Sequence, residues 1–292
     1  MMSANTLVCG LIANPIGHSL SPLLHNTLAE RMGVDLAYLP FPVREAEQLG
    51  EAIHGAYALG IRGLNVTVPY KMAVLPFLCG LDRAAEQIGA VNTLLRTDQG
   101  YLGCNTDLPG MERLLKREGI SLRGEPVLLL GAGGAARAIA VMAALHGASE
   151  LTVLNRSAER AEQFVSELQS RFPGTCFTAA GLDGWRELSR QDYIAFQCSS
   201  VGMYPYTEKS LIPETDFYHK PRCGVDLIYT PSETEFMRRL SAAGREALGG
   251  LDMLLYQGVL SFELWTGRSV PEALCAELRA CLQRELSRRE RE

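Results

Sequence analysis

Apolar residues occur along this chain in two alternating kinds of run. Short, nearly continuous apolar stretches such as PVLLL (126–130) are typical of buried strands. Longer stretches with apolar residues at every third or fourth position, such as LPGMERLLKRE (108–118), are typical of amphipathic helices. The two kinds alternate nearly throughout, without an internal repeat or a low-complexity segment, and they predict an α/β fold with parallel sheets.

Two interruptions of this pattern suggest domain boundaries. The segment GISLRGE (119–125) separates an amphipathic run from the apolar strand after it, and glycine and small residues interrupt the pattern at 244–250. We therefore expect a central domain at 108–249, inserted in a domain formed by 1–107 plus 250–292. A chain of 292 residues, 47% of them hydrophobic, is long enough to bury two cores.

Charge and cysteine content narrow the functional class. Lys and Arg number 28 and Asp and Glu 33, so the net charge is −5, and the only basic cluster is the mixed tail SRRERE, which argues against a nucleic-acid partner. No charged residue precedes Glu30, and polar residues are scattered before it, which argues against a secretory signal or a membrane span. Eight irregularly spaced cysteines without a CxxC pair favour reduced thiols over disulfides or zinc. We expect a cytoplasmic enzyme, a monomer or homodimer, with no nucleic-acid, membrane or metal partner.

The strongest local signal is a glycine-rich turn. The segment PVLLLGAGGAARA leads from a buried strand through a turn into a helix of small residues, and it fits G-x-G-x-x-G/A through Gly131, Gly133 and Ala136. Glycine at 131 permits the turn, glycine at 133 lets the backbone approach a pyrophosphate, and the helix N-terminus offers unpaired N–H groups to it. The pattern predicts a dinucleotide site, and the alternative is a tight turn with no ligand.

The end of the next strand predicts which dinucleotide binds. An NAD site usually has Asp or Glu there, whereas this chain has Asn155 and Arg156, with Arg160 one turn later. Arginine presents a positive charge and several hydrogen-bond donors to the 2′-phosphate of NADP, whereas a carboxylate would repel that phosphate. The pattern favours NADP; the alternative is that Ser157 only caps a helix and both arginines are solvated.

Polar residues elsewhere form a second candidate site. In the segment NVTVPYK, Asn65 and Thr67 share one face of a strand, and Pro69 suits the first turn of a helix after it. Lys71 would then lie at the mouth of whatever that strand lines. A lone lysine is usually a solvated surface residue, whereas one beside a carboxylate can pass a proton to a developing alkoxide. The sequence alone does not show that Lys71 meets Asp107.

Several other polar residues allow two interpretations each. Ser19 and Ser21 could gather with a helix N-terminus around a carboxylate, but Ser21, directly before a proline, could also be a simple N-cap. Asn92 and Asp107 each end a stretch of strand character, and Asp107 is also a good N-cap for the helix after it. Gln257 lies in an apolar helical stripe, so it needs a partner, either backbone or a ligand hydroxyl.

Taken together and in order, the motifs of this chain resemble the shikimate dehydrogenase family. They are HSLSP, NVTVPYK, GAVNTL, NTD, GAGGAARA, NRS followed by Arg160, VGM, DLIYTP and MLLYQG, between about residues 8 and 267. The resemblance implies a Rossmann-like, doubly wound NADP-binding domain inserted in an α/β substrate domain, with a cleft between them. It also implies an oxidoreductase that reversibly reduces 3-dehydroshikimate to shikimate with NADPH, a step of aromatic amino acid biosynthesis in the chorismate pathway.

The resemblance assigns roles to residues at matching positions. Lys71 and Asp107 match the catalytic pair. Substrate binding is implied for Ser19, Ser21, Asn65, Thr67, Asn92, Asp107, Tyr229 and Gln257, with the two serines on the substrate carboxylate. Cofactor binding is implied for Gly131, Ala132, Gly133, Gly134, Ala135, Ala136, Asn155, Arg156, Ser157, Arg160, Leu227 and Gly250, with the last two at the nicotinamide end.

The chain departs from the family pattern in two segments. Leu108 and Pro109 follow NTD, where the family often has glycine, which affects the helix entrance rather than Asp107 itself. The residues 197–199 read QCS, where the family usually has Asn-Ala-Thr, and this puts in doubt a direct role of their side chains at the nicotinamide.

Two alternative functions compete with this assignment. A quinate/shikimate dehydrogenase of the same family would favour NAD, which the pair Arg156 and Arg160 argues against. A non-catalytic metabolite-sensing homologue could lose Lys71 or Asp107 without penalty, yet both are present.

Overall fold

The computed structural model describes residues 3–17 and 19–291. The chain forms two compact units, Met1–Met111 with Leu254–Leu282, and Glu112–Met253 with Gln283–Glu292. The boundaries expected from sequence differ from this division by a few residues in the middle of the chain, and residues 283–292 belong to the second unit rather than the first. The assignment of one domain to substrate and the other to cofactor stays a prediction.

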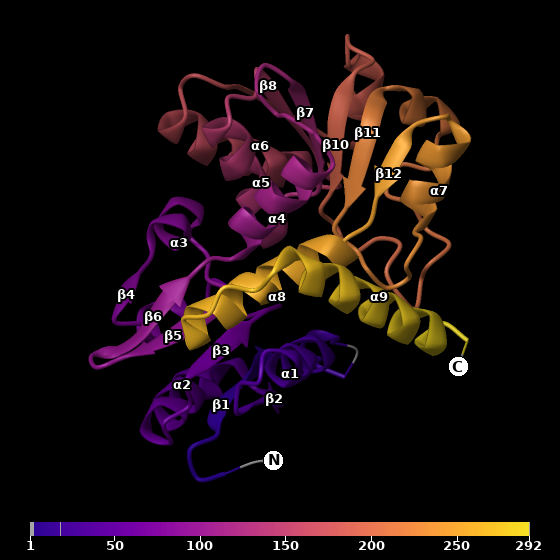
Figure 1. Cartoon of the computed structure of the whole chain (residues 1–292). Coiled ribbons are helices and arrows are strands. Elements are labelled where there is room, and N and C mark those ends of the chain that lie inside the picture. The colour runs from indigo at the N-terminus through magenta and orange to yellow at the C-terminus, as the bar shows by residue number, and fades with distance from the viewer. Residues whose placement is uncertain (1–2, 18, 292) are drawn as a thin grey trace. The chain divides into compact units, whose positions relative to one another are not determined.

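The first unit contains a mixed sheet with the strand order β2-β1-β3-β5-β6-β4 (Figure 1). Its strands are β1 (Leu7–Ala13), β2 (Leu36–Pro42), β3 (Gly63–Val66), β4 (Gly80–Leu81), β5 (Thr93–Thr97) and β6 (Gly100–Cys104). β1 pairs in parallel with β2 and β3, whereas β5 pairs antiparallel with β3 and β6. The expectation of parallel sheets holds for the pairs of β1 with β2 and β3 and of β4 with β6. It fails at β5, because only residues 98 and 99 link β5 to β6, and so short a link allows only a hairpin.

Helices complete this unit. They are α1 (Ser21–Arg31), α2 (Leu49–Ala58), α3 (Arg83–Ile88), most of α8 (Leu251–Thr266) and the first part of α9 (Glu272–Arg289), with single turns at Ala46–Gln48 and Leu75–Phe77. The buried Trp265 fixes α8 on the sheet, since its indole Nε1 donates to Leu94 O at 3.0 Å. The same ring fills the space that a Cβ on Gly63 would need, so glycine at 63 permits the contact.

The second unit contains a wholly parallel sheet with the order β12-β11-β10-β7-β8-β9 (Figure 1). Its strands are β7 (Pro126–Leu130), β8 (Glu150–Leu154), β9 (Cys176–Ala180), β10 (Tyr193–Gln197), β11 (Pro221–Asp226) and β12 (Glu246–Leu248). This is the doubly wound dinucleotide-binding order, and its direction of winding reverses between β7 and β10. Ligands of such sheets bind at the carboxyl ends of the strands beside that reversal.

The helices of the second unit include α5 (Gly134–Leu145), α6 (Ala158–Arg171) and α7 (Glu235–Ala242), with short turns at Leu182–Glu187 and Thr215–His219. The helix α4 (Asp107–Arg117) begins in the first unit and ends in the second. The strand, turn and helix predicted around the glycine motif are confirmed as β7, residues 131–133 and α5. Among the residues that the structure describes, no helix is long and apolar enough to span a membrane.

Candidate active site

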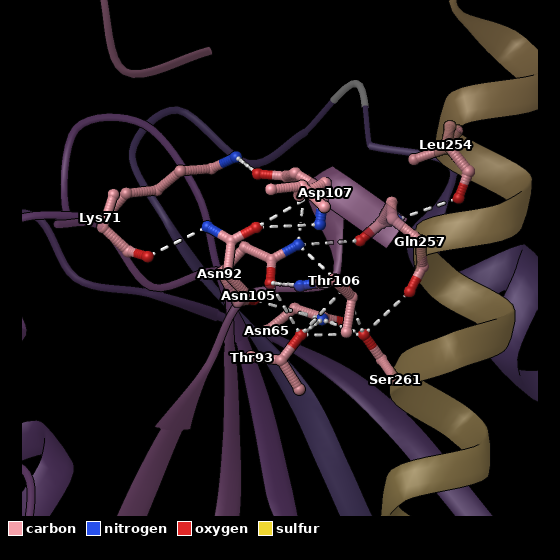
Figure 2. A network of polar contacts seen from close by, with 12 residues as sticks. Asn65, Lys71, Asn92, Thr93, Asn105, Thr106, Asp107, Leu254, Gln257 and Ser261 are labelled. Carbon is pink, nitrogen blue, oxygen red and sulfur yellow. Dashed lines mark hydrogen bonds and ion pairs between the residues drawn. The ribbon is translucent and has the colours of Figure 1, made fainter. Parts of the chain in front are cut away.

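Lys71 and Asp107 form an ion pair in the first unit (Figure 2). The Lys71 Nζ lies 2.5 Å from Asp107 Oδ2, and the two side chains are 22% and 9% exposed, so the lysine side chain is partly open to solvent. The backbone holds the lysine in place, because Lys71 O accepts from Val91 N at 2.8 Å. The contact that the sequence could not establish is therefore present.

Asp107 does not cap the helix that it begins. The Oδ1 of Asn105 accepts from the backbone N–H of Asp107 at 3.0 Å and of Leu108 at 3.3 Å, which satisfies two of the free donors at the start of α4. Pro109 in the first turn has no N–H to satisfy. The N-cap interpretation of Asp107 is thus wrong, and its carboxylate is available for Lys71. Asn105 was missed, although an Asx residue two positions before a helix start is a recognisable signal.

Asn92 joins this carboxylate to the rest of the network. Its Nδ2 lies 2.9 Å from Asp107 Oδ1 and 3.3 Å from Gln257 Oε1, and its Oδ1 accepts from Thr106 N at 2.8 Å (Figure 2). Each carboxylate oxygen of Asp107 thus has a different partner, Asn92 on one and Lys71 on the other. The orientation of the carboxylate is fixed from both sides.

Gln257 reaches the network from α8, the helix predicted for it. Its Nε2 donates to Leu254 O at 2.9 Å, so both the backbone partner and a side-chain partner, Asn92, are present. The first turn of α4 touches α8 at this point, since a Cβ on Gly110 would lie 2.9 Å from Gln257 N. Sequence reasoning missed Gly110, although a glycine inside a helical pattern is costly enough to suggest close packing.

Asn65 and Thr67 occupy different environments. Asn65 is 5% exposed, and its Oδ1 accepts from the Tyr38 hydroxyl at 2.7 Å, while Thr67 follows β3 and is half-buried. The helix expected after Pro69 is absent, because residues 67–74 form turns; the Thr67 carbonyl accepts from Tyr70 N at 2.8 Å. These turns carry Lys71 back toward Asp107.

Ser19 and Ser21 lie at the start of α1. The motif that contains them begins at His18, which lies outside the described residues. The N-cap of α1 is Leu20, whose side chain makes no capping bond, so the N-cap interpretation of Ser21 is wrong. Ser19 Oγ accepts from Ser21 N at 3.2 Å.

The Ser21 hydroxyl also lies beside Tyr38. Burial raises the pKa of Tyr38 well above its usual range, and the Ser21 hydroxyl offsets part of this increase.

The glycine turn has the geometry that its motif predicts. Gly131 has a φ of +113°, which side chains rarely adopt, and a Cβ there would also crowd Ser199 N at 3.3 Å. Gly133 is the N-cap of α5, and a Cβ on Gly133 or Gly134 would meet no atom within 4 Å, so the space in front of the helix is open. Ala136 is fully buried against the sheet, whereas Ala132 and Ala135 are half-buried.

The segment after β8 contains a helix cap at Ser157 and two exposed arginines, so both sequence interpretations of this segment describe part of it. Ser157 caps α6, since its Oγ accepts from Arg160 N at 3.2 Å, and Asn155 Nδ2 donates to Ser157 O at 2.9 Å. The guanidinium groups of Arg156 and Arg160 are exposed, and neither has a hydrogen bond or ion pair with any described residue. The two arginines are therefore available to an anion.

Leu227 and Gly250 lie against each other. A Cβ on Gly250 would lie 2.3 Å from Leu227 O, and Gly250 N donates to Ile228 O at 3.0 Å, so only glycine permits this approach. Tyr229 follows in the same segment of the second unit and is half-buried.

The carboxylate before this segment, Asp226, was missed by sequence reasoning. It accepts from Ile228 N at 2.9 Å and from the Thr234 hydroxyl at 2.6 Å, and burial raises its pKa to about 7.

The residues that depart from the family pattern after β10 have internal roles. The buried Gln197 donates from Nε2 to Ser199 O at 3.2 Å and to Val201 O at 2.9 Å, and its Oε1 accepts from Ser199 N at 2.8 Å. Gln197 thus fixes the turn that follows β10, beside the glycine turn. Burial raises the pKa of the Cys198 thiol. Across residues 3–17 and 19–291, no group of three His, Cys, Asp or Glu side chains could hold a metal ion.

Three family models match successive parts of this chain. They describe the substrate binding domain of shikimate dehydrogenase (residues 11–94), shikimate/quinate 5-dehydrogenase (113–183) and the C-terminal domain of shikimate 5′-dehydrogenase (250–277). The NADP(+) shikimate dehydrogenase of Methanopyrus kandleri is 42% identical over 281 residues, which cover 94% of this chain and 96% of that protein.

Solved structures agree with these sequence matches. The chorismate mutase/shikimate 5-dehydrogenase fusion protein of Clostridium acetobutylicum superposes with a TM-score of 0.87 at 31% identity, covering 97% of this chain and 99% of the other. Shikimate 5-dehydrogenase of Thermus thermophilus, solved with NADP(H) and shikimate, has a TM-score of 0.81 at 33% identity, covering 94% of this chain and 98% of the other.

Proposed function

This chain belongs to the shikimate dehydrogenase family, and on that premise we propose that it reversibly reduces 3-dehydroshikimate to shikimate with NADPH. The Lys71–Asp107 ion pair is the observation that carries the proposal, because a ketone reductase needs a proton donor that small molecules can reach. The free arginines after β8 support NADP as the cofactor.

The chemical step places a hydride on the ketone carbon and a proton on its oxygen. Bound NADPH supplies the hydride. Lys71 donates the proton to the oxygen, and in the oxidation direction its amine accepts the proton from the alcohol. Asp107 keeps the ammonium oriented, and Asn92 holds the other carboxylate oxygen, so the donor is in place before the substrate arrives.

The substrate carboxylate binds at the start of α1 in this proposal. The hydroxyls of Ser19 and Ser21 can contact it together, at the positive end of the helix dipole. Gln257 holds a ring hydroxyl, since only one of its two Nε2 hydrogens is directed at Leu254 O. Thr67 and Asn92 contact other ring hydroxyls. The substrate-binding role implied for Tyr229, a residue of the second unit, stays a prediction.

In this proposal NADP binds to the glycine turn and to the exposed arginines after β8, both in the second unit. The pyrophosphate lies over the turn formed by residues 131–136, where the absence of a Cβ at Gly133 leaves room for it. Arg156 and Arg160 bind the 2′-phosphate, with Asn155 and Ser157 shaping the loop between them. Leu227 and Gly250 line the nicotinamide end. The central domain, 108–249, is then the NADP-binding domain, and 1–107 plus 250–292 bind substrate and carry the catalytic pair.

The decisive assay offers shikimate and quinate, each with NADP and with NAD, and follows the absorbance of the reduced cofactor. Fastest turnover with shikimate and NADP supports the proposal. Faster turnover with quinate and NAD would identify the quinate/shikimate alternative, and shikimate binding without turnover would identify the metabolite sensor. A cytoplasmic location, a monomeric or homodimeric state and the lack of a nucleic-acid partner stay predictions.

A further inference from the structure

Two neighbouring strands of the second unit end in a buried polar residue. Gln197 is the last residue of β10 and Asp226 the last of β11, and the two lie side by side in the sheet (Figure 1). They are 1% and 0% exposed. Gln197 Oε1 accepts from Ser199 N at 2.8 Å. In the same way, Asp226 Oδ1 accepts from Ile228 N at 2.9 Å. Both side chains thus hold the turns at the carboxyl ends of these strands, the edge at which ligands of doubly wound sheets bind.

The carboxylate of Asp226 lies in surroundings that disfavour its charge. Burial raises its pKa to about 7, and it has no ion pair with any residue that the structure describes. Its nearby charge also adds to the effect of burial in raising the pKa of the Cys198 thiol. An asparagine would fill nearly the same volume without a buried charge. The stability of the fold therefore does not by itself favour a carboxylate at this position.

A carboxylate is, however, the group that satisfies both donors around it. The Thr234 hydroxyl donates to Asp226 Oδ2 at 2.6 Å, while Ile228 N uses the other oxygen. Thr234 is also the N-cap of α7, and its oxygen accepts from Met237 N at 3.3 Å. An amide NH2 in place of Oδ2 would leave the Thr234 hydroxyl proton without an acceptor. The carboxylate therefore joins the segment after β11 to the start of α7.

The segment that Asp226 holds is in direct contact with Gly250. Leu227 N donates to Gln197 O at 3.0 Å, and Gly250 N donates to Ile228 O at 3.0 Å. A Cβ on Gly250 would lie only 2.3 Å from Leu227 O, so the two backbones leave no space between them. A shift of Ile228 would therefore also move Leu227 and Gly250, the two residues assigned above to the nicotinamide end of the cofactor.

We propose that Asp226 is a positioning residue, which holds Leu227 and Gly250 in place for the nicotinamide ring of NADPH, and that Thr234 assists it from α7. The proposal rests on the proposed function and extends it to residues that act through others. Asp226 and Thr234 are 0% and 1% exposed, so neither touches the cofactor itself. Their loss should weaken binding of the nicotinamide ring and leave binding of the rest of the cofactor unchanged.

Calorimetric titration with two ligands tests this division. One ligand is NADPH, and the other is 2′-phospho-ADP-ribose, which lacks only the nicotinamide. The titrations are run at about pH 8, where the carboxyl group of Asp226 is mostly ionised. We expect Asp226→Asn to raise the Kd for NADPH about tenfold and to leave the Kd for 2′-phospho-ADP-ribose within about twofold of wild type.

Thr234 provides a second variant and its rescue. Thr234→Val removes the hydroxyl and should also raise the Kd for NADPH selectively, whereas Thr234→Ser keeps the hydroxyl and should retain the wild-type Kd within about twofold. If Asp226→Asn does not fold, this pair of variants carries the test.

Thr175→Val is the matched control for Thr234→Val. Thr175 is 3% exposed, and its hydroxyl donates to Ala148 O at 3.3 Å in the same unit. It directly precedes β9 and so lies at the opposite, amino-terminal edge of the parallel sheet. This variant loses a buried hydroxyl as Thr234→Val does, but it should change neither Kd by more than about twofold.

The outcomes separate this proposal from the proposed function. A wild type that does not bind NADPH would contradict the proposed function. A wild type that binds NADPH, with Kd values that Asp226→Asn and Thr234→Val leave unchanged, would overturn the positioning role alone. Equal losses for NADPH and 2′-phospho-ADP-ribose, or an equal selective loss in Thr175→Val, would also overturn it.

Discussion

The side chain of Asn105 accepts the backbone N–H of Asp107 at 3.0 Å, and this contact decides what the aspartate can do. Because Asn105 takes the capping role, the carboxylate of Asp107 turns to Lys71 and Asn92 instead of to its own helix. A residue outside the proposed substrate contacts thus controls the orientation of the proposed catalytic pair.

The Asn105→Ala variant tests whether Asn105 orients the carboxylate of Asp107. Loss of the cap and of the buried bond from Asn105 Nδ2 to Ala90 O at 2.9 Å should lower the free energy of unfolding by about 2 kcal/mol. It should also lower kcat, because Asp107 can then turn toward the free N–H groups of α4. Urea unfolding and steady-state kinetics measure both effects. Thr175→Ala, which removes a buried hydroxyl bonded to Ala148 O in the second unit, is the control that should lower stability without lowering kcat. An unchanged kcat in Asn105→Ala would show that the cap does not orient Asp107.

Gly110→Ala should weaken substrate binding through the contact between α4 and α8. The added methyl group would lie 2.9 Å from Gln257 N, so one helix must shift, at a cost of about 1–3 kcal/mol typical of overpacked sites. We expect a lower melting temperature and a raised KM for shikimate. Gly55→Ala, in α2, is the control, since no atom lies within 4 Å of its new methyl group. Unchanged kinetics and stability in Gly110→Ala would contradict this packing.

Arg156→Ala and Arg160→Ala should each reduce affinity for NADPH and leave affinity for NADH nearly unchanged. Each removes one charged donor from the 2′-phosphate, a loss of about 1.5–3 kcal/mol for a charge-assisted hydrogen bond and thus about tenfold or more in Kd. Titration of cofactor fluorescence measures both constants. Arg190→Ala, which removes an exposed arginine paired with Asp192, is the control. Equal losses for NADPH and NADH would mean that the arginines do not recognise the 2′-phosphate.

His25 should make stability depend on pH in the acid range. It is fully buried, stacks on Tyr38 at 4.3 Å, and has no hydrogen-bond partner for either ring nitrogen among the described residues. Burial lowers its pKa from 6.5 to about 3. The unfolded chain therefore binds a proton that the folded protein does not, so this stability is complete above about pH 6.5 and is lost as pH falls toward 3, by about 1.4 kcal/mol per pH unit.

The difference in unfolding free energy between wild type and His25→Phe isolates this contribution. Between about pH 7 and pH 5 the wild type should lose about 2 kcal/mol more than His25→Phe, since other groups contribute equally to both proteins. His54→Phe, which replaces an exposed histidine, is the control. A difference that stays constant over this range would contradict the burial of a neutral His25.

Local patterns predicted the second unit well. The glycine turn needs only a strand, three residues and a helix in order, so Gly131, Gly133 and Ala136 could be placed from neighbours in sequence. The first unit was less predictable, because its mixed sheet depends on the two-residue link between β5 and β6, which no hydrophobic pattern marks. Pro69 likewise fits both a helix start and the turn that is observed.

The contacts of the candidate site depend on sequence-distant residues. Lys71 and Asp107 are separated by 36 positions, and Gln257 comes from the other end of the chain, so only the order of the strands brings them together. Periodicity marked Gln257 as a polar residue in an apolar stripe, but it could not identify Asn92 as a partner. The sequence offers Asp107 as an N-cap as readily as Asn105, because both residue types favour the position and helix boundaries are uncertain by one or two residues.

Turnover of Lys71→Ala tests the proposed role of this lysine most directly. If Lys71 donates the proton, kcat should fall by about 10²- to 10⁴-fold with little change in the KM for shikimate, because the interaction is made chiefly in the transition state. Lys116→Ala, which removes an exposed lysine of α4, should retain wild-type kinetics. A kcat for Lys71→Ala close to that of the wild type would contradict the role of Lys71 as the proton donor.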